Sequence, residues 1–264
     1  MSNAGTSPPE PEPWGALASW YDSLLVAGSG PHETAVACLL GLVPDLTDAD
    51  LLDVACGQGL ATRALAEAGA ATVTGVDAAA AMIDLARQRT DPAAPVTYLV
   101  DDATHLAAIN DRMVDGVTCQ LGLMDITDLV ATLGSISRVL RPGGWLVAVI
   151  GHPCFLAPQA VTTEVDGKPA RAVHTYFDEG LWRSSNPHGI RGRAGNYHRT
   201  LATYLNVLIR AGFTIEEIAE PPCQPAAGRP AAHLRPRADL PRTASHHQQP
   251  SVARIADRVP LADP

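Results

Sequence analysis

One stretch of nine residues decides the fold: Leu51-Leu52-Asp53-Val54-Ala55-Cys56-Gly57-Gln58-Gly59. It begins as a short apolar strand, ends in a glycine-rich turn, and leads directly into an amphipathic helical pattern. This order brings the N–H groups of a helix N-terminus toward a ligand. Gly57 and Gly59 lack Cβ atoms, so the ligand can approach the main chain. The stretch therefore predicts a nucleoside-binding strand, turn and helix.

The acids around this turn indicate which nucleoside binds. A second strand, residues 71–76, ends in Asp77, whose carboxylate can accept hydrogen bonds from both ribose hydroxyls. The dinucleotide fingerprint has glycine where this chain has Ala55 and Thr62. Asp53 would repel a pyrophosphate but could hold the ammonium of an amino acid. These features favour S-adenosylmethionine over a nicotinamide dinucleotide. The cofactor-binding residues predicted in this region are Asp53, Ala55, Cys56, Gly57, Gly59 and Asp77.

Four motifs in this order resemble those of the class I S-adenosylmethionine-dependent methyltransferases, in particular the small-molecule group called type 11. They are the loop at 53–59, the third strand at 96–103, the fourth strand at 115–121, and the helix, Pro-Gly-Gly turn and fifth strand at 138–146. The resemblance covers roughly residues 14–220. It implies further cofactor contacts from Ala78, Met82, Asp102, Ala103 and Gln120, with Tyr21 either near the methionine carboxylate or simply packed on the core.

Strand and helix patterns alternate from Leu51 to Ile150, which is typical of parallel βαβ units. We expect an α/β fold, with a doubly wound, mostly parallel, Rossmann-like sheet and helices on both faces. A helical cap precedes the sheet, and a lid insertion at about 152–198 follows the fifth strand. The methyltransferase-like domain is expected at 14–220, after a disordered N-terminus at 1–13.

The C-terminal tail, residues 221–264, is rich in proline, which interrupts helices and strands. No strand is predicted after Ile218, and residues 251–256 are only a weak candidate for the last antiparallel strand of the family. The tail is therefore expected to be disordered, and truncation after about Ala226 to change the melting temperature by only a few degrees. If the tail instead supplies an edge strand, truncation would be strongly destabilising.

Aromatic residues gather in the first predicted helix and in residues 152–204, away from the central strands. This placement predicts a pocket for a small molecule that is partly aromatic or apolar. His198 is the first candidate for a base or substrate-orienting group, and His152 the second. Alternatively, each histidine bonds to a loop carbonyl. Asp125 and Asp128 flank a helix start and are interpreted as capping groups.

The overall composition limits the classes of partner. The formal net charge is −9, and Lys168 is the only lysine, so a nucleic-acid partner is not expected. No apolar run reaches membrane-spanning length. The five cysteines show no paired spacing, which favours reduced thiols and a cytoplasmic location. No metal site is predicted, and the oligomeric state stays open.

These observations favour one function over two others. The first is transfer of a methyl group from S-adenosylmethionine to an O or N nucleophile of a small molecule. The second is an S-adenosylmethionine-binding protein without transferase activity, in an assembly or cyclase-like role. The third, an NAD-dependent oxidoreductase, is disfavoured by Asp53 and Thr62.

Overall fold

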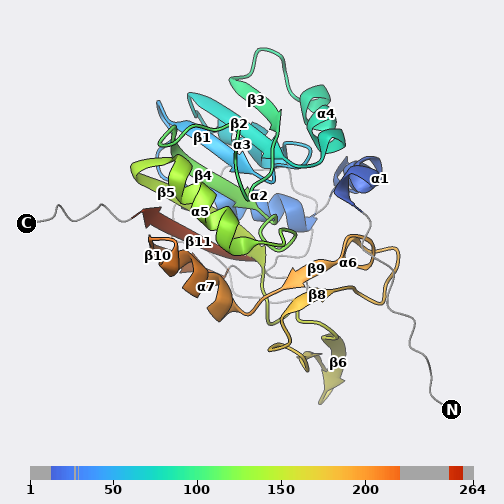
Figure 1. Cartoon of the computed structure of the whole chain (residues 1–264). Coiled ribbons are helices and arrows are strands. Elements are labelled where there is room, and N and C mark those ends of the chain that lie inside the picture. The colour runs from blue at the N-terminus through green and yellow to red at the C-terminus, as the bar shows by residue number, and fades with distance from the viewer. Residues whose placement is uncertain (1–12, 27, 29, 221–249, 258–264) are drawn as a thin grey trace, which may run out of the picture.

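The computed structural model describes residues 13–26, 28, 30–220 and 250–257, which build a seven-stranded sheet in the order β10-β11-β5-β4-β1-β2-β3 (Figure 1). The strands are β1 (Asp50–Val54), β2 (Thr72–Asp77), β3 (Val96–Val100), β4 (Val114–Gln120), β5 (Leu140–Gly151), β10 (Phe213–Ala219) and β11 (Pro250–Asp257). Strands β1 to β5 are parallel, and β11 is antiparallel to both of its neighbours. The predicted doubly wound, mostly parallel class is confirmed.

Helices bury both faces of the sheet. One face packs against α2 (Gly30–Leu42) and α3 (Leu60–Glu67), the other against α5 (Leu129–Val139) and α7 (Leu201–Arg210). Successive residues of one strand serve opposite faces, so Val147 and Leu146 belong to different core clusters. This two-sided burial explains why the central strands β1 and β5 are nearly continuous apolar runs in the sequence.

The N-terminal cap is held in place by an ion pair. Helix α1 (Trp14–Val26) packs against α4 (Ala80–Arg89), which itself lies on β2 and β3. Arg89 Nη2 donates to Asp22 Oδ2 at 2.5 Å, and the Asp22 side chain is largely buried. Removing Arg89 would leave the largely buried carboxylate of Asp22 without its partner, so the pair helps to hold α1 against α4. None of the described helices combines the length and apolar character needed to cross a membrane.

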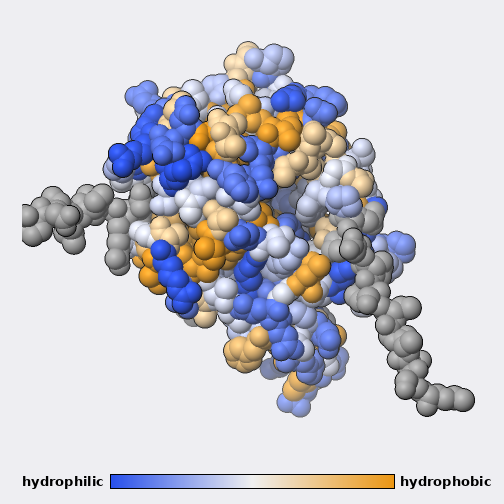
Figure 2. Space-filling model, in the orientation of Figure 1, coloured by the Kyte–Doolittle hydropathy of each residue, from blue (hydrophilic) through white to orange (hydrophobic). Residues whose placement is uncertain are grey.

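The segment after β5 forms two antiparallel hairpins rather than a plain loop. It contains β6 (Val161–Val165), β7 (Lys168–Ala172), β8 (Gly180–Trp182), α6 (Ile190–Arg193) and β9 (Asn196–His198). The β6–β7 hairpin extends away from the body and is largely exposed (Figure 1). Figure 2 shows mainly hydrophilic side chains on this projection, with a few hydrophobic ones between them. The α6 and β9 end of the segment returns to the sheet.

The tail prediction is wrong for residues 250–257, because β11 runs between β5 and β10. Its register extends from Pro250 opposite Gly151 to Ala256 opposite Trp145, and from Val252 opposite Ala219 to Asp257 opposite Phe213. The backbone N–H and C=O groups of β11 pair with those on the facing edges of β5 and β10. This pairing explains why a segment whose own sequence gives only a weak strand pattern forms a strand. The remaining predictions of disorder, for residues 1–12, 221–249 and 258–264, lie outside the described residues.

Candidate active site

A cavity of about 380 Å³ lies beyond the carboxyl ends of the parallel strands, where ligands bind in open α/β sheets. Nine of the predicted cofactor residues line it, namely Tyr21, Ala55, Gly57, Asp77, Ala78, Met82, Asp102, Ala103 and Gln120. Asp53, Cys56 and Gly59 are not part of its wall. Sequence reasoning missed Trp14, Asp101 and Asp125, among others.

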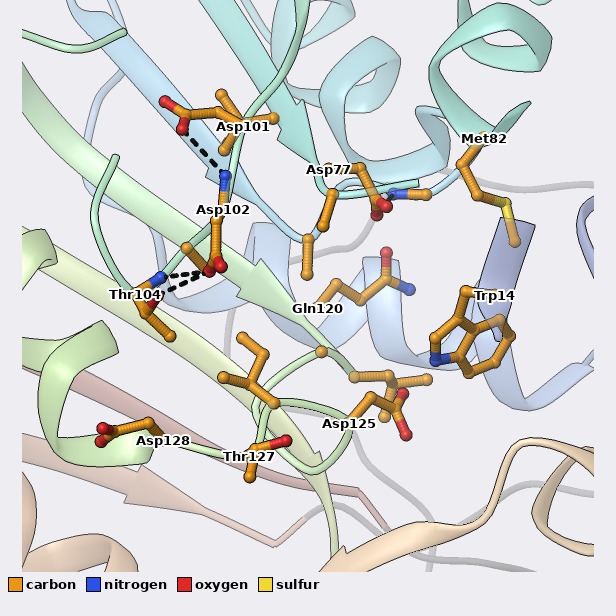
Figure 3. A pocket seen from close by; sticks show the side chains of 18 of the residues that line it. Trp14, Asp77, Met82, Asp101, Asp102, Thr104, Gln120, Asp125, Thr127 and Asp128 are labelled. Atoms are coloured by element: carbon orange, nitrogen blue, oxygen red, sulfur yellow. Dashed lines mark hydrogen bonds between the residues drawn. The ribbon is translucent and has the colours of Figure 1, made fainter. Parts of the chain in front are cut away.

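The charge of this cavity is one-sided. Five aspartates belong to its wall, Asp77, Asp101, Asp102, Asp125 and Asp128, and the described lining residues include no Lys, Arg or His. The carboxylates of Asp101 and Asp128 are bound by backbone N–H groups of their own segments. Figure 3 shows Asp77 and Asp125 around a common space with Gln120 and Trp14, whereas the carboxylates of Asp101 and Asp128 point away from it. A cationic ligand is stabilised there, whereas a phosphate would be repelled. The wall therefore fits S-adenosylmethionine, which carries a sulfonium and an ammonium, better than a dinucleotide.

Asp77 is held at the end of β2 by the main chain of two turns. Its Oδ2 accepts from Gly57 N and its Oδ1 from Ala79 N, both at 2.9 Å. Burial raises the pKa of this carboxyl, although the two backbone bonds oppose that effect. Each carboxylate oxygen can accept a second hydrogen bond, so both remain able to bind ribose hydroxyls. The geometry supports the predicted role of Asp77.

The two glycines of the loop meet different structural requirements. Gly57 has φ +54°, and no atom lies within 4 Å of the place where a Cβ would stand, so this side of the turn is open to the cavity. Gly59 has φ +81°, and a Cβ there would lie 2.3 Å from the hydroxyl of Tyr98. Gly59 is therefore required by packing against β3 rather than by a ligand. The sequence did not separate these roles.

Asp53 lies behind the loop instead of facing the cavity. It is fully buried, and its oxygens accept from Thr62 Oγ1 at 2.6 Å and from Thr118 Oγ1 at 2.8 Å. Cys56 is buried as well and packs near Tyr98. These contacts favour a supporting role for both residues over the direct cofactor contact expected from the sequence. Asp53 joins β1, α3 and β4 below the cavity.

The buried Asp53 predicts a pH-dependent stability difference. Burial raises the pKa of Asp53 to about 6, although the two threonine hydroxyls oppose the shift. A carboxyl with a raised pKa stabilises the fold fully below its unfolded pKa of about 4, and this contribution is lost as the pH rises through about 6. Asparagine at position 53 does not ionise, so Asp53→Asn does not lose stability in this way as the pH rises. Between pH 4 and pH 7, the free energy of unfolding of Asp53→Asn should gain about 2 kcal/mol relative to the unmodified protein.

Urea titrations at both pH values measure this difference. The exposed Asp84 provides a control, since its replacement by Asn should leave the difference constant. A constant difference for Asp53→Asn as well would contradict the raised pKa.

Tyr21 and Gln120 connect three elements at the cavity wall. Tyr21 Oη lies 2.8 Å from His32 Nε2, and Gln120 Nε2 donates to the backbone oxygen of His32 at 3.0 Å. Burial lowers the pKa of His32 to about 4, so its imidazole is neutral at neutral pH. Helices α1 and α2 are thereby fixed to the end of β4, and Tyr21 is positioned at the cavity rather than packed only on the core.

A second cavity of about 260 Å³ adjoins the first. The two share four wall residues, Trp14, Tyr21, Leu121 and Asp125. The rest of the second wall comes from α2, the loop after β4, the end of β5 and the segment that follows it. These residues are Pro31, His32, Met124, Gly151, Leu156, Ser184, Asn186, Gly189, Ile190, Arg191 and Gly192. Part of the predicted lid thus covers this second space.

The two candidate histidines lie outside the walls of both cavities. His198 is 2% exposed, and its Nε2 lies 2.8 Å from the carbonyl oxygen of Tyr176. His152 Nε2 lies 2.8 Å from Glu220 Oε1, and its Nδ1 accepts from Cys154 N at 3.2 Å. These contacts favour the structural alternative for both histidines, and no observation here supports the catalytic role predicted for them.

The two acids after β4 differ in role. Asp128 is the N-cap of α5, where its side chain accepts from Ala131 N at 2.9 Å, as expected. The capping interpretation is wrong for Asp125, whose carboxylate accepts from Arg191 Nη1. Arg191 lies 66 residues further along the chain, so no local pattern could indicate this pair.

The sheet order, the β11 insertion and the acidic cavity at the strand ends define the class of nucleoside-binding α/β methyltransferase folds. Residues 52–148 match the family model described as "Methyltransferase domain". An N-demethylindolmycin N-methyltransferase from Streptomyces griseus is 32% identical over 190 residues, which cover 68% of this chain and 78% of that protein. The chain belongs to the S-adenosylmethionine-dependent methyltransferase family, and it is an enzyme that uses S-adenosylmethionine as its cofactor.

Two further similarities agree with this assignment. A ubiquinone biosynthesis O-methyltransferase from Xanthomonas oryzae pv. oryzae (strain PXO99A) is 37% identical over 138 residues, which cover 51% of this chain and 57% of that protein. The crystal structure of an S-adenosylmethionine dependent methyltransferase from Mesorhizobium loti superposes with a TM-score of 0.68 at 25% identity, covering 87% of this chain and 99% of that one.

Proposed function

We propose that this enzyme transfers the methyl group to an O or N nucleophile of a small molecule that is partly aromatic or apolar. The observation that supports the proposal most directly is the second cavity, which adjoins the cofactor cavity and shares four wall residues with it. Relatives named as an N-methyltransferase and an O-methyltransferase support either nucleophile. The net charge of −9 argues against a nucleic-acid acceptor.

The first cavity has the residues needed to hold the cofactor. Asp77 offers acceptors for the ribose, Asp102 and Met82 line the remainder of the nucleoside side, and Gly57 lets the ligand approach the main chain. When bound, the cofactor supplies a methyl group that is already activated on a positively charged sulfur. The protein then has to align the acceptor with that methyl group and exclude water, because orientation supplies most of the acceleration of an in-line displacement.

The second cavity has the composition of a small-molecule site. Its wall combines apolar and aromatic residues, among them Trp14, Tyr21, Leu121, Leu156 and Ile190, with five polar or charged ones, His32, Asp125, Ser184, Asn186 and Arg191. Such walls, with a few polar groups, are typical of small-ligand pockets. We infer that residues 152–198 act as the lid over the acceptor, since Leu156, Ser184, Asn186 and α6 belong to this wall.

Replacing Ile190 by Trp tests the assignment of the two cavities. Ile190 lines only the second cavity, so the added indole should reduce the space for the acceptor and leave the first cavity unchanged. We expect the Kd for S-adenosylmethionine to stay within about twofold, and the KM of the acceptor to rise by at least about tenfold. Calorimetry gives the Kd, and transfer from methyl-labelled cofactor to a panel of phenols and aromatic amines gives the KM.

Two outcomes of this experiment would contradict the proposal. Weaker cofactor binding with an unchanged acceptor KM would reverse the assignment of the cavities. Tight binding of the cofactor with no transfer to any member of the panel would contradict the proposed class of acceptor.

A further inference from the structure

The junction of the two cavities is the place where the methyl group has to pass from donor to acceptor. Its wall consists of Trp14, Tyr21, Leu121 and Asp125, and Asp125 is the only carboxylate among these four. A side chain at this junction can contact both the reacting cofactor group and the acceptor. The chemistry of Asp125 therefore bears on which acceptor the enzyme selects.

Asp125 is fixed in position and still able to bind a ligand. Its side chain is 16% exposed, and Arg191 Nη1 donates to Oδ1. Arg191 is itself held by the carbonyl oxygen of Gly195 at 3.2 Å and by Met124 Sδ at 2.8 Å. Among the described residues, Arg191 is the side chain that donates a hydrogen bond to this carboxylate, and the bond goes to Oδ1. Oδ2 can therefore still accept a hydrogen bond from a ligand. Figure 3 shows Asp125 beside Trp14, with Gln120 between it and Asp77.

The electric field at the junction distinguishes between acceptor classes. Arg191, in the wall of the second cavity, balances one negative charge, whereas Asp125 and Asp77 place two carboxyl groups around the junction, Asp77 from the first cavity only. A cationic amine would be attracted to this wall. A phenol that loses its proton would instead place a negative charge beside the carboxylate of Asp125, and the two like charges would repel each other. The neutral His32 on the same wall does not offset that repulsion.

We propose that the acceptor is an amine and that Asp125 is a catalytic residue that binds its nitrogen. This inference rests on the proposed function and narrows it. Asp125 accepts a hydrogen bond from the protonated amine and takes its proton, which frees the nitrogen lone pair. The lone pair forms the new N–C bond as the C–S bond breaks, and the electron pair of that bond stays on sulfur. The proton on Asp125 then passes to water.

Sinefungin and S-adenosylhomocysteine are the probes for this assignment. Sinefungin carries an ammonium where the methylated sulfonium would be, whereas S-adenosylhomocysteine is neutral at that atom. We expect the unmodified enzyme to bind sinefungin more tightly. Asp125→Asn should weaken sinefungin binding by about 10- to 100-fold, as for a hydrogen bond between charged groups. The affinity for S-adenosylhomocysteine should change by less than about threefold, which also shows that the fold is intact.

Asp84→Asn is the matched control, because it removes the same charge from an exposed site on α4. Equal losses for both probes with Asp125→Asn, or an unchanged affinity for sinefungin, would overturn the inference. So would methyl transfer to tryptophol in preference to tryptamine, two acceptors that differ in the hydroxyl and the amine. A protein that binds neither probe would overturn the proposed function itself, and this inference with it.

Discussion

Deletion of residues 250–264 should destabilise the protein severely. The deletion removes β11 and leaves the inner edges of both β5 and β10 without backbone partners. Unpaired backbone groups next to a hydrophobic core are costly, and a loss of roughly 5 kcal/mol is a large part of a typical domain stability. For a chain of this size, such a loss lowers the melting temperature by about 10–20 °C.

Differential scanning calorimetry of two truncated proteins measures this effect. Truncation after Asp257 is the control, because it retains the whole of β11 and should leave the melting temperature within a few degrees. Truncation after Gln249 is the deletion of residues 250–264. If it changed the melting temperature as little as the control does, the pairing of β11 with β5 would be wrong and the prediction of a dispensable tail would be right.

Asp77→Ala should weaken the binding of S-adenosylmethionine by about 1.5–3 kcal/mol, or roughly 10- to 150-fold. The carboxylate lies in the wall of the first cavity, where both of its oxygens can accept from the ribose. The same substitution leaves Gly57 N and Ala79 N without their acceptor, so the turn also loses some rigidity. Calorimetric titration gives the affinity, and thermal unfolding gives the change in stability.

Asp77→Asn separates these two effects. Its amide oxygen can still accept one of the backbone bonds, whereas its amide nitrogen cannot accept from a ribose hydroxyl. We therefore expect Asn to restore part of the stability and to leave most of the binding defect. An affinity within twofold of the unmodified protein for both variants would remove Asp77 from the cofactor site.

The central fold was predictable because its signals are local. The strand, turn and helix at 51–66 and the apolar strand at 72–77 follow one another in the chain, and their glycines and acids stand at fixed offsets. Nine of the predicted cofactor positions line the first cavity for the same reason. A parallel sheet brings the ends of successive strands to one edge, so residues at these ends meet.

The features that sequence reasoning missed depend on contacts between distant residues. β11 lies next to β5, about a hundred residues earlier, and its own residues give a weak strand pattern. Asp53 pairs in register with Thr118 on β4, which turns its carboxylate into the core. The need for glycine at position 59 comes from Tyr98, and the role of Asp125 comes from Arg191.

Titration of the purified protein with S-adenosylmethionine and, in parallel, with NADH tests the central claim most directly. The cavity is acidic, and no basic residue lines it in the part of the chain that the structure describes. It should bind the cationic cofactor with a Kd in the range of about 1–100 μM and should show no measurable binding of the dinucleotide. Binding of NADH with comparable or higher affinity, or no binding of S-adenosylmethionine, would contradict the account.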